Sequence, residues 1–244
     1  MSGKTNGCVV SVVTRAGVPI LTIPSNDKAN IFAMLVYSLI NFASALGVKT
    51  KTLSYDIRGR KLHILLAEKT FLAIYVPGYL DMKARRFLEL SSSLLEKLNN
   101  TIVEEGVIDD TIIRMTREEI MRIATSSGIP IGGITTFRKV CGDLYGELLS
   151  RGVKGDIFRG YFRVGYFPRL LNHRLIEREK NPLLRRVLEL CDGNNSVAYI
   201  CDTLGIPESK LYRFIAGLLG RGLMTLEVGF ELVDNVPQDT SDTA

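Results

Sequence analysis

The sequence predicts an α+β protein made of two folded domains joined by a helical connector. Residues 8–98 alternate β-rich runs with two helical segments in the order β-β-α-β-β-β-α, and residues 181–233 contain three short helical segments followed by a β-rich run. Both assignments rest on hydrophobic periodicity and on glycine or proline at the element ends. We therefore expect a domain at 1–100, a connector at 101–180, a second domain at 181–234 and a disordered polar tail at 235–244.

The first domain opens with a hairpin and a long helix. Residues 8–23 contain two β-rich runs around Ala16 and Gly17, which is typical of a β-hairpin. Residues 27–47 follow as an apolar helix that ends at a glycine, where a helix C-cap is common. The remaining elements are three strands and a closing helix, expected at 51–57, 61–67, 71–76 and 81–98.

The helix at 27–47 and two of the strands are apolar on nearly every side. Residues 9–13 and 72–76 carry apolar side chains at both parities, which predicts strands buried on both faces. A helix that is apolar all round is likewise covered on more than one side. The sheet covers one side, and either the rest of this chain or a second copy covers the other. The side chains that would mediate self-association are Ile31, Leu35, Leu39 and Phe42.

This first domain resembles a longin domain. The likeness lies in the turn Thr14-Arg15-Ala16-Gly17-Val18-Pro19-Ile20, the long apolar helix, the three-strand meander and the closing helix. It is most similar to the first longin domain of the SAND type, found in Rab-activating complexes. The related roadblock fold shares the five-stranded sheet but carries a helix before the hairpin, for which residues 1–7 are too short. The resemblance implies a non-catalytic platform that dimerises and binds small GTPases or trafficking and signalling partners, and it assigns no binding residue.

The connector contains two predicted helices. Thr116 and Glu119 match a capping box, which predicts a helix from there to about Ser126. A glycine-rich loop follows, and a second helix with apolar residues at helical spacing is expected at 134–151.

Aromatic and basic residues alternate in the next stretch, residues 158–169, which includes Arg159 and Arg163. Surfaces that bind single-stranded nucleic acid combine such residues, because bases stack on the rings and guanidinium groups contact phosphate. The alternative, which we favour, is a strand or arm whose rings are buried while its arginines face solvent.

The C-terminal domain is predicted to be a winged helix. Helices are expected at 183–191, 197–204 and 208–219, and residues 223–233 are expected to form a short β pair. Helices followed by such a wing give the winged-helix order. The segment resembles the winged-helix modules of many prokaryotic regulators, and we expect the whole chain to be archaeal.

Charge bears on whether DNA or protein binds this winged helix. Residues 181–244 hold 5 Lys/Arg against 9 Asp/Glu, whereas residues 1–100 hold 13 against 6. DNA-binding modules are usually basic, because phosphate neutralisation supplies much of their affinity. Lys210 and Arg213 are the candidate groove contacts, while Glu227 and Glu231 would repel phosphate. We therefore favour a protein partner and keep DNA binding as the alternative.

A basic turn in the first domain is a second candidate contact surface. Arg58, Arg60 and Lys61 lie between two predicted strands. They are either solvated turn charges or contacts for an acidic partner surface or a nucleic-acid backbone.

Motifs of enzymes and cofactor-binding proteins do not occur in the sequence. It has no P-loop, GxGxxG, HExxH or GxSxG motif, and Gly3-Lys4-Thr5 only imitates the end of a P-loop. Four scattered cysteines without a CxxC pair and only two histidines predict no metal site and no cofactor. We also expect no secretion signal and no membrane span, and hence a cytoplasmic location.

We therefore expect a non-enzymatic regulatory or scaffold protein that forms a homodimer through its first domain. Its partner would be a protein such as a small GTPase or a cytoskeletal or membrane-remodelling component. The alternative is a DNA-binding transcriptional regulator that uses the C-terminal winged helix.

Overall fold

A computed structural model describes residues 7–25, 29–101, 109–131, 134–153, 158 and 160–233. The fold is of the α+β class, with helices and antiparallel sheets. The chain divides into two compact units, Met1–Lys154 and Gly155–Ala244. This division differs from the expected boundaries at 100 and 180, because the segment set apart as a connector is shared between the two units.

The first unit is built on a five-stranded antiparallel sheet with the strand order β2-β1-β5-β4-β3. The strands are β1 (Val9–Thr14), β2 (Pro19–Ile23), β3 (Thr52–Ile57), β4 (Arg60–Leu66) and β5 (Thr70–Pro77). They coincide closely with the strands expected from the sequence. β5 is buried along its whole length and β1 along most of it, which confirms burial of these strands on both faces.

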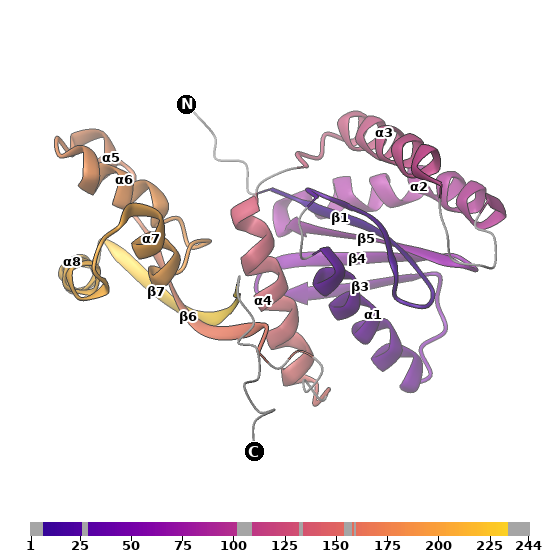
Figure 1. Cartoon of the computed structure of the whole chain (residues 1–244), viewed down its shortest axis with the longest axis horizontal. Helices are drawn as coiled ribbons and strands as arrows, with labels where there is room; N and C mark the ends of the chain where they lie inside the picture. The colour runs from indigo at the N-terminus through magenta and orange to yellow at the C-terminus, as the bar shows by residue number, and fades with distance from the viewer. Residues whose placement is uncertain are drawn as a thin grey trace, which may run out of the picture. The chain divides into compact units, whose positions relative to one another are not determined.

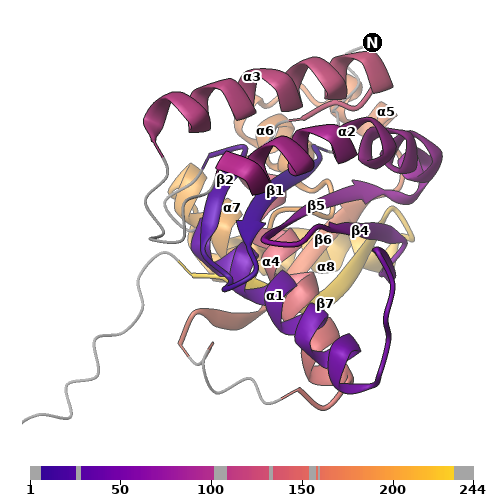
Figure 2. The ribbon, with the colours of Figure 1, turned by 90° about the vertical axis from the view of Figure 1, so that its right-hand side faces the viewer.

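Each face of this sheet is covered by helices, as Figures 1 and 2 show. α2 and α3 lie over one face, α1 and α4 lie over the other, and the short helix η1 joins β5 to α2. The helices are α1 (Ala29–Ala45), η1 (Gly78–Leu80), α2 (Asp81–Thr101), α3 (Asp110–Ser127) and α4 (Ile134–Ser150). The core under α2 and α3 contains Val10, Ile74, Phe87 and Ile120.

The helix α1 is covered on its second side by α4 of the same chain. The ring centroids of Phe32 in α1 and Phe137 in α4 lie 6.1 Å apart. On the sheet side, the Tyr55 hydroxyl donates to the Leu39 carbonyl at 3.1 Å. The side chains expected on a self-association surface are therefore inside the first unit: Ile31, Leu35 and Leu39 are buried and Phe42 is half-buried. Of the two covers considered, the structure has the intramolecular one.

The helix α3 begins earlier than its capping box predicted. Asp109 is the N-cap, and its Oδ1 accepts a hydrogen bond from the Thr111 amide at 2.6 Å. Thr116 is buried in the middle of the helix, and Glu119 pairs with Arg122 at 2.6 Å instead of capping. The predicted start at Thr116 is wrong, because an aspartate upstream satisfies the first amides.

The second unit combines a two-stranded ribbon with short helices. Its elements are β6 (Phe162–Leu170), α5 (Arg174–Arg178), α6 (Pro182–Leu190), α7 (Val197–Leu204), α8 (Glu208–Gly220) and β7 (Met224–Leu232). Asn181 caps α6 by accepting from the Leu183 amide at 2.9 Å, and Ser196 caps α7 by accepting from the Tyr199 amide at 3.1 Å. These caps place α6 and α7 close to where the sequence predicted them.

The two strands of the ribbon come from the two ends of the second unit. β6 and β7 run antiparallel in register from Phe162 opposite Leu232 to Leu170 opposite Met224. The aromatic–basic stretch is thus a strand. The predicted short β pair within 223–233 is wrong, because Gly229 faces Gly165 in the middle of the ladder instead of turning the chain.

Candidate functional site

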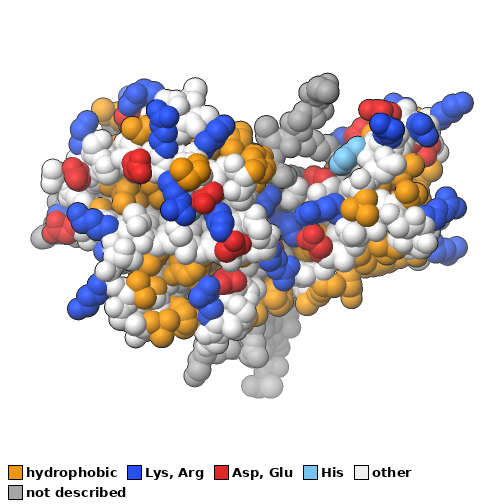
Figure 3. Space-filling view, turned by 180° about the vertical axis from the view of Figure 1, so that it is seen from behind, with side chains coloured by type: hydrophobic (Ala, Val, Ile, Leu, Met, Phe, Trp, Pro, Cys, Tyr) orange, Lys and Arg blue, Asp and Glu red, His pale blue; other side chains and the backbone are white. Residues whose placement is uncertain are grey.

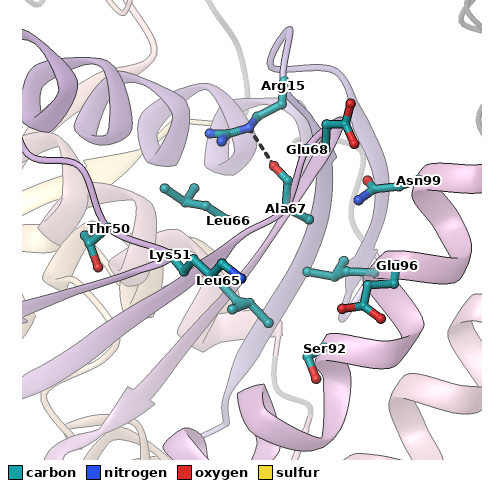
Figure 4. A pocket seen from close by; sticks show the side chains of 11 residues that line it. Arg15, Thr50, Lys51, Leu65, Leu66, Ala67, Glu68, Ser92, Glu96 and Asn99 are labelled. Carbon is teal, nitrogen blue, oxygen red and sulfur yellow. Dashed lines mark hydrogen bonds between the residues drawn. The ribbon is translucent and has the colours of Figure 1, made fainter.

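A polar pocket of about 530 Å³ lies in the first unit beside α2, where β4 ends and the chain enters β3 (Figure 4). Its charged lining has both signs, with Arg15 and Lys51 on one hand and Glu68 and Glu96 on the other. Its described lining contains no histidine or cysteine. The pocket therefore offers paired charges for a mixed-charge ligand or segment, and no group that ordinarily titrates near neutral pH.

Two side chains of the pocket also hold its walls together. The Arg15 Nε donates to the Ala67 carbonyl at 2.9 Å, the contact drawn in Figure 4. Asn99 of α2 accepts from the Lys69 amide at 3.2 Å and from the Thr70 hydroxyl at 3.0 Å. These hydrogen bonds join the β4–β5 turn to the hairpin and to α2.

A serine, a histidine and an aspartate form a hydrogen-bonded cluster on the same side of the sheet. The Ser54 Oγ of β3 lies 2.7 Å from the His63 Nδ1 of β4, and the His63 Nε2 lies 2.7 Å from the Asp81 Oδ1 of α2. Arg85 also contacts Asp81, at 3.3 Å. His63 is almost fully buried, whereas Ser54 is exposed.

The environment favours a neutral His63. Burial lowers its pKa, and this effect outweighs the opposite influence of the Asp81 carboxylate. Although desolvation acts to raise the pKa of Asp81, hydrogen bonds from Arg85 and His63 bring it below its usual value. The tautomer that satisfies both neighbours donates from Nε2 to Asp81 and accepts at Nδ1 from the Ser54 hydroxyl. The cluster therefore joins β3, β4 and α2 through polar contacts of 2.7 Å.

Sequence reasoning missed this cluster, although a signal for it exists. Arg58 and Gly59 form a two-residue turn with positive φ at both positions. Counting outward from such a turn places Ser54 opposite His63, as the strand register has it. The contact with Asp81 has no comparable local signal, because it depends on where α2 packs.

The residues of the basic turn each have an acidic or aromatic neighbour. The Arg58 Nη1 lies 3.9 Å from the Asp143 Oδ1 of α4, and the Lys61 Nζ lies 2.6 Å from Asp56. The Arg60 guanidinium lies 5.7 Å from the centre of the Tyr75 ring. The side chains of Arg58 and Lys61 are nevertheless 48% and 30% exposed, so a partner can reach them.

In the second unit the aromatic–basic stretch has its arginines in ion pairs. The Arg163 Nε lies 2.6 Å from the Glu231 Oε1, and the Arg169 Nη2 lies 3.3 Å from the Glu227 Oε1. Phe167 is buried. Arg159 lies outside the described residues. The stretch is a strand, as in the favoured interpretation, but its rings are only partly buried, since Tyr166 is 42% exposed, and two glutamates accompany the arginines.

The helix α8 carries the candidate DNA contacts next to an apolar strip. Lys210 and Arg213 are both exposed. The rings of Tyr212 in α8 and Tyr166 in β6 meet edge to face with centroids 6.4 Å apart. Figure 3 shows apolar side chains along one edge of this unit, and the exposed apolar residues of the ribbon include Val164 and Val228. Such a surface is more typical of protein contacts than of phosphate contacts.

Metal ligands do not gather in the part of the chain that the structure describes, where no three His, Cys, Asp or Glu residues could hold an ion together. The four cysteines are buried, and burial raises the pKa of Cys8 to about 12, so this thiol stays protonated. None of the described helices combines the length and the apolar character needed to cross a bilayer.

Comparison with solved structures finds chains similar to this one. No family model matches the sequence, and no curated protein matches it. Among solved structures the chain is similar to MglB of Myxococcus xanthus, with 12% sequence identity and a TM-score of 0.24 over 48% of this chain and 74% of that chain. A similarity of this size carries no argument about fold or function.

Proposed function

We propose that this protein is a regulatory or scaffold protein that self-associates and binds a protein partner through its first unit. The longin resemblance supports this, and it makes a small GTPase or a cytoskeletal or membrane-remodelling component the expected partner class. The first unit has the parts that the resemblance requires: a hairpin, the helix α1, a three-strand meander, the helix α2 and a five-stranded sheet. The helices α3 and α4 are additions to that plan.

The observation that carries the proposal is the free edge of β3. Among the described strands, β3 pairs only with β4. The Leu66 amide donates to the Lys51 carbonyl at 2.8 Å, and residues that bond across an antiparallel ladder alternate with residues that do not. The backbone groups of Ser54 and Asp56 therefore point away from β4. An edge of this kind accepts a strand from another chain.

The polar pocket lies next to this edge. Thr50 and Lys51, the residues before β3, belong to its lining. A strand added to β3 would therefore run beside the pocket, with Glu96 of α2 on the opposite wall. The edge would supply backbone hydrogen bonds, and the pocket would select which side chain of the added strand binds.

Light scattering on the full chain tests the self-association. We expect a dimer mass for the natural sequence and for Ser54→Ala, which keeps the backbone amide. Ser54→Pro removes the outward amide and should give a monomer mass, with circular dichroism showing that it is folded. A natural protein that stays monomeric at high concentration, or a Ser54→Pro variant that stays dimeric, would refute strand pairing at β3.

A second candidate function is DNA binding by the second unit. It is favoured by the exposure of Lys210 and Arg213 on α8, the third helix in the order α6, α7, α8. The proposal that this unit is a winged helix rests on that order, with β7 as the strand after α8 and β6 as its partner. The apolar strip beside α8 supports the protein-binding alternative.

A further inference from the structure

Two large apolar side chains at the start of α2 are unusually exposed. Tyr79 in η1 is 72% exposed and Met82 in the first turn of α2 is 76% exposed. Their spacing of three residues is that of neighbours on one helix face. Isolated exposed apolar residues are common, but a neighbouring pair of a tyrosine and a methionine resembles the centre of a protein interface.

The backbone brings the basic turn next to this pair. The Gly78 amide donates to the Gly59 carbonyl at 3.1 Å. A Cβ on Gly78 would lie 2.8 Å from that same oxygen, so only a glycine permits this approach. The β3–β4 turn and the start of α2 consequently form one surface.

Basic side chains surround the pair. Arg86 is exposed one helical turn after Met82, and the Arg85 side chain is 57% exposed. We call this surface the Tyr79 patch, and it comprises Tyr79, Met82, Lys61, Arg85 and Arg86. Two carboxylates lie within it, since Asp56 contacts Lys61 and Asp81 contacts Arg85. The patch thus has an apolar centre and a rim in which positive charge exceeds negative charge.

We propose that the Tyr79 patch binds an acidic segment of a partner protein that inserts an apolar side chain against Tyr79 and Met82. This rests on the proposed function, for which it defines the chemistry of the partner. Tyrosine, methionine and arginine are enriched at protein interfaces, and buried tyrosine and arginine contacts dominate their energetics. The surplus of positive charge attracts carboxylates and speeds their association.

Two other polyanions fit the patch less well. A nucleic acid would need several rings on which successive bases stack, and the patch has one. A membrane surface is uniformly anionic, so Asp56 and Asp81 would oppose it. A protein surface can match both signs of charge, because it can place its own basic groups opposite these aspartates.

Nuclear magnetic resonance of the full chain labelled with ¹³C at its methionine methyl groups tests the proposal. The probe is a synthetic peptide in which aspartate and glutamate alternate with leucine and phenylalanine. We expect the peptide to shift the Met82 signal and to leave that of Met115, an exposed methionine of α3, unchanged. The same peptide with lysine at every acidic position should shift neither signal. Phosphatidylserine vesicles and single-stranded DNA are added separately.

Surface variants then assign the contacts. Tyr79→Ala combined with Met82→Ala should weaken peptide binding at least about tenfold, measured by fluorescence anisotropy, whereas Met115→Ala should leave it unchanged. Arg86→Glu should weaken binding and make it less dependent on salt. The proposal is overturned if the acidic peptide leaves Met82 unmoved, if the lysine peptide shifts it equally, or if only vesicles or DNA shift it.

The two proposals fail in different ways. Ser54→Pro alters the β3 edge and leaves the Tyr79 patch intact. A monomeric protein whose Met82 signal still responds to the acidic peptide would refute self-association alone. A dimer without that response would refute the binding chemistry of the patch alone.

Discussion

The ring of His63 lies 2.7 Å from the carboxylate of Asp81, which connects β4 to the first residue of α2. The other ring nitrogen lies 2.7 Å from the Ser54 hydroxyl of β3. One buried side chain therefore bridges the edge of the sheet and the helix that covers it. Buried polar contacts between three elements favour one arrangement of those elements.

Replacing His63 should destabilise the first unit. His63→Ala removes the hydrogen bond with Ser54, the contact with Asp81 and a packed ring, and we expect a loss of about 2 kcal/mol in the free energy of unfolding. Urea titration followed by circular dichroism measures it. His173→Ala is the matched control, because the other histidine of the chain is exposed and its loss should change stability by less than about 0.5 kcal/mol. Equal effects of the two variants would contradict a structural role for the cluster.

Stability should also fall in mild acid because of His63. Its pKa is lowered in the folded protein, so the unfolded chain takes up the proton at a higher pH. The contribution of neutral His63 is complete above the unfolded value of 6.5 and decreases as the pH falls below it. The lowered pKa of Asp81 affects the stability only at a pH near and below 3.8, which lies outside this range.

The measurement compares urea midpoints at about pH 7.5 and about pH 5.5, on either side of that value. The natural protein should lose more stability between these conditions than His63→Gln, whose side chain does not titrate. Parallel losses in both proteins would show that other groups cause the pH dependence.

The close approach of Gly78 to Gly59 predicts opposite effects for two glycine substitutions. Gly78→Ala places a Cβ 2.8 Å from a backbone oxygen and should cost about 2 kcal/mol of stability. Gly217→Ala in α8 meets no atom within 4 Å and should raise stability by up to about 1 kcal/mol through helix propensity. Thermal unfolding of the two variants, compared with the natural protein, shows whether stability falls in the first and rises in the second. A neutral Gly78→Ala would mean that the β3–β4 turn can move away.

Duplex DNA should bind weakly at physiological salt. Fluorescence anisotropy with a labelled duplex, across a salt series, measures this. We expect only weak binding at about 0.15 M salt, because the candidate contacts Lys210 and Arg213 lie beside an apolar strip and both ribbon arginines are in ion pairs. Tight, salt-dependent binding that Lys210→Glu with Arg213→Glu abolishes would establish the DNA regulator instead.

Local signals in the sequence were sufficient for most elements. The strands β1 to β5 and the helix α2 follow from alternation, turn residues and apolar periodicity, all of which act over a few positions. The start of α3 was misplaced because two signals competed: a capping box at Thr116 and an aspartate cap at Asp109. The aspartate determines the start because it lies first in the chain and its side chain reaches the helix amides.

Contacts between distant residues could not be predicted. The sequence showed that α1 needs a second cover, but it could not choose α4 over a second copy, since both bury the same apolar face. The pairing of β6 with β7 was also missed. Alternation of side chains predicts a strand, but it does not predict which strand lies beside it. Candidate site residues were found where a turn or a charge pattern marked them, as at Arg58, and missed where tertiary packing assembles the group, as at Asp81.

The pairing of β6 with β7 has a consequence for how the chain folds during synthesis. The first sheet is complete once Pro77 has left the ribosome. In contrast, β6 stays unpaired until β7, which ends at Leu232, has been synthesised. Contacts between residues far apart in sequence form slowly, because a long loop must close before they stabilise anything. Until β7 has been synthesised, β6 and its aromatic side chains therefore lack a partner strand and can aggregate, and a chain cut short before Met224 would keep β6 unpaired.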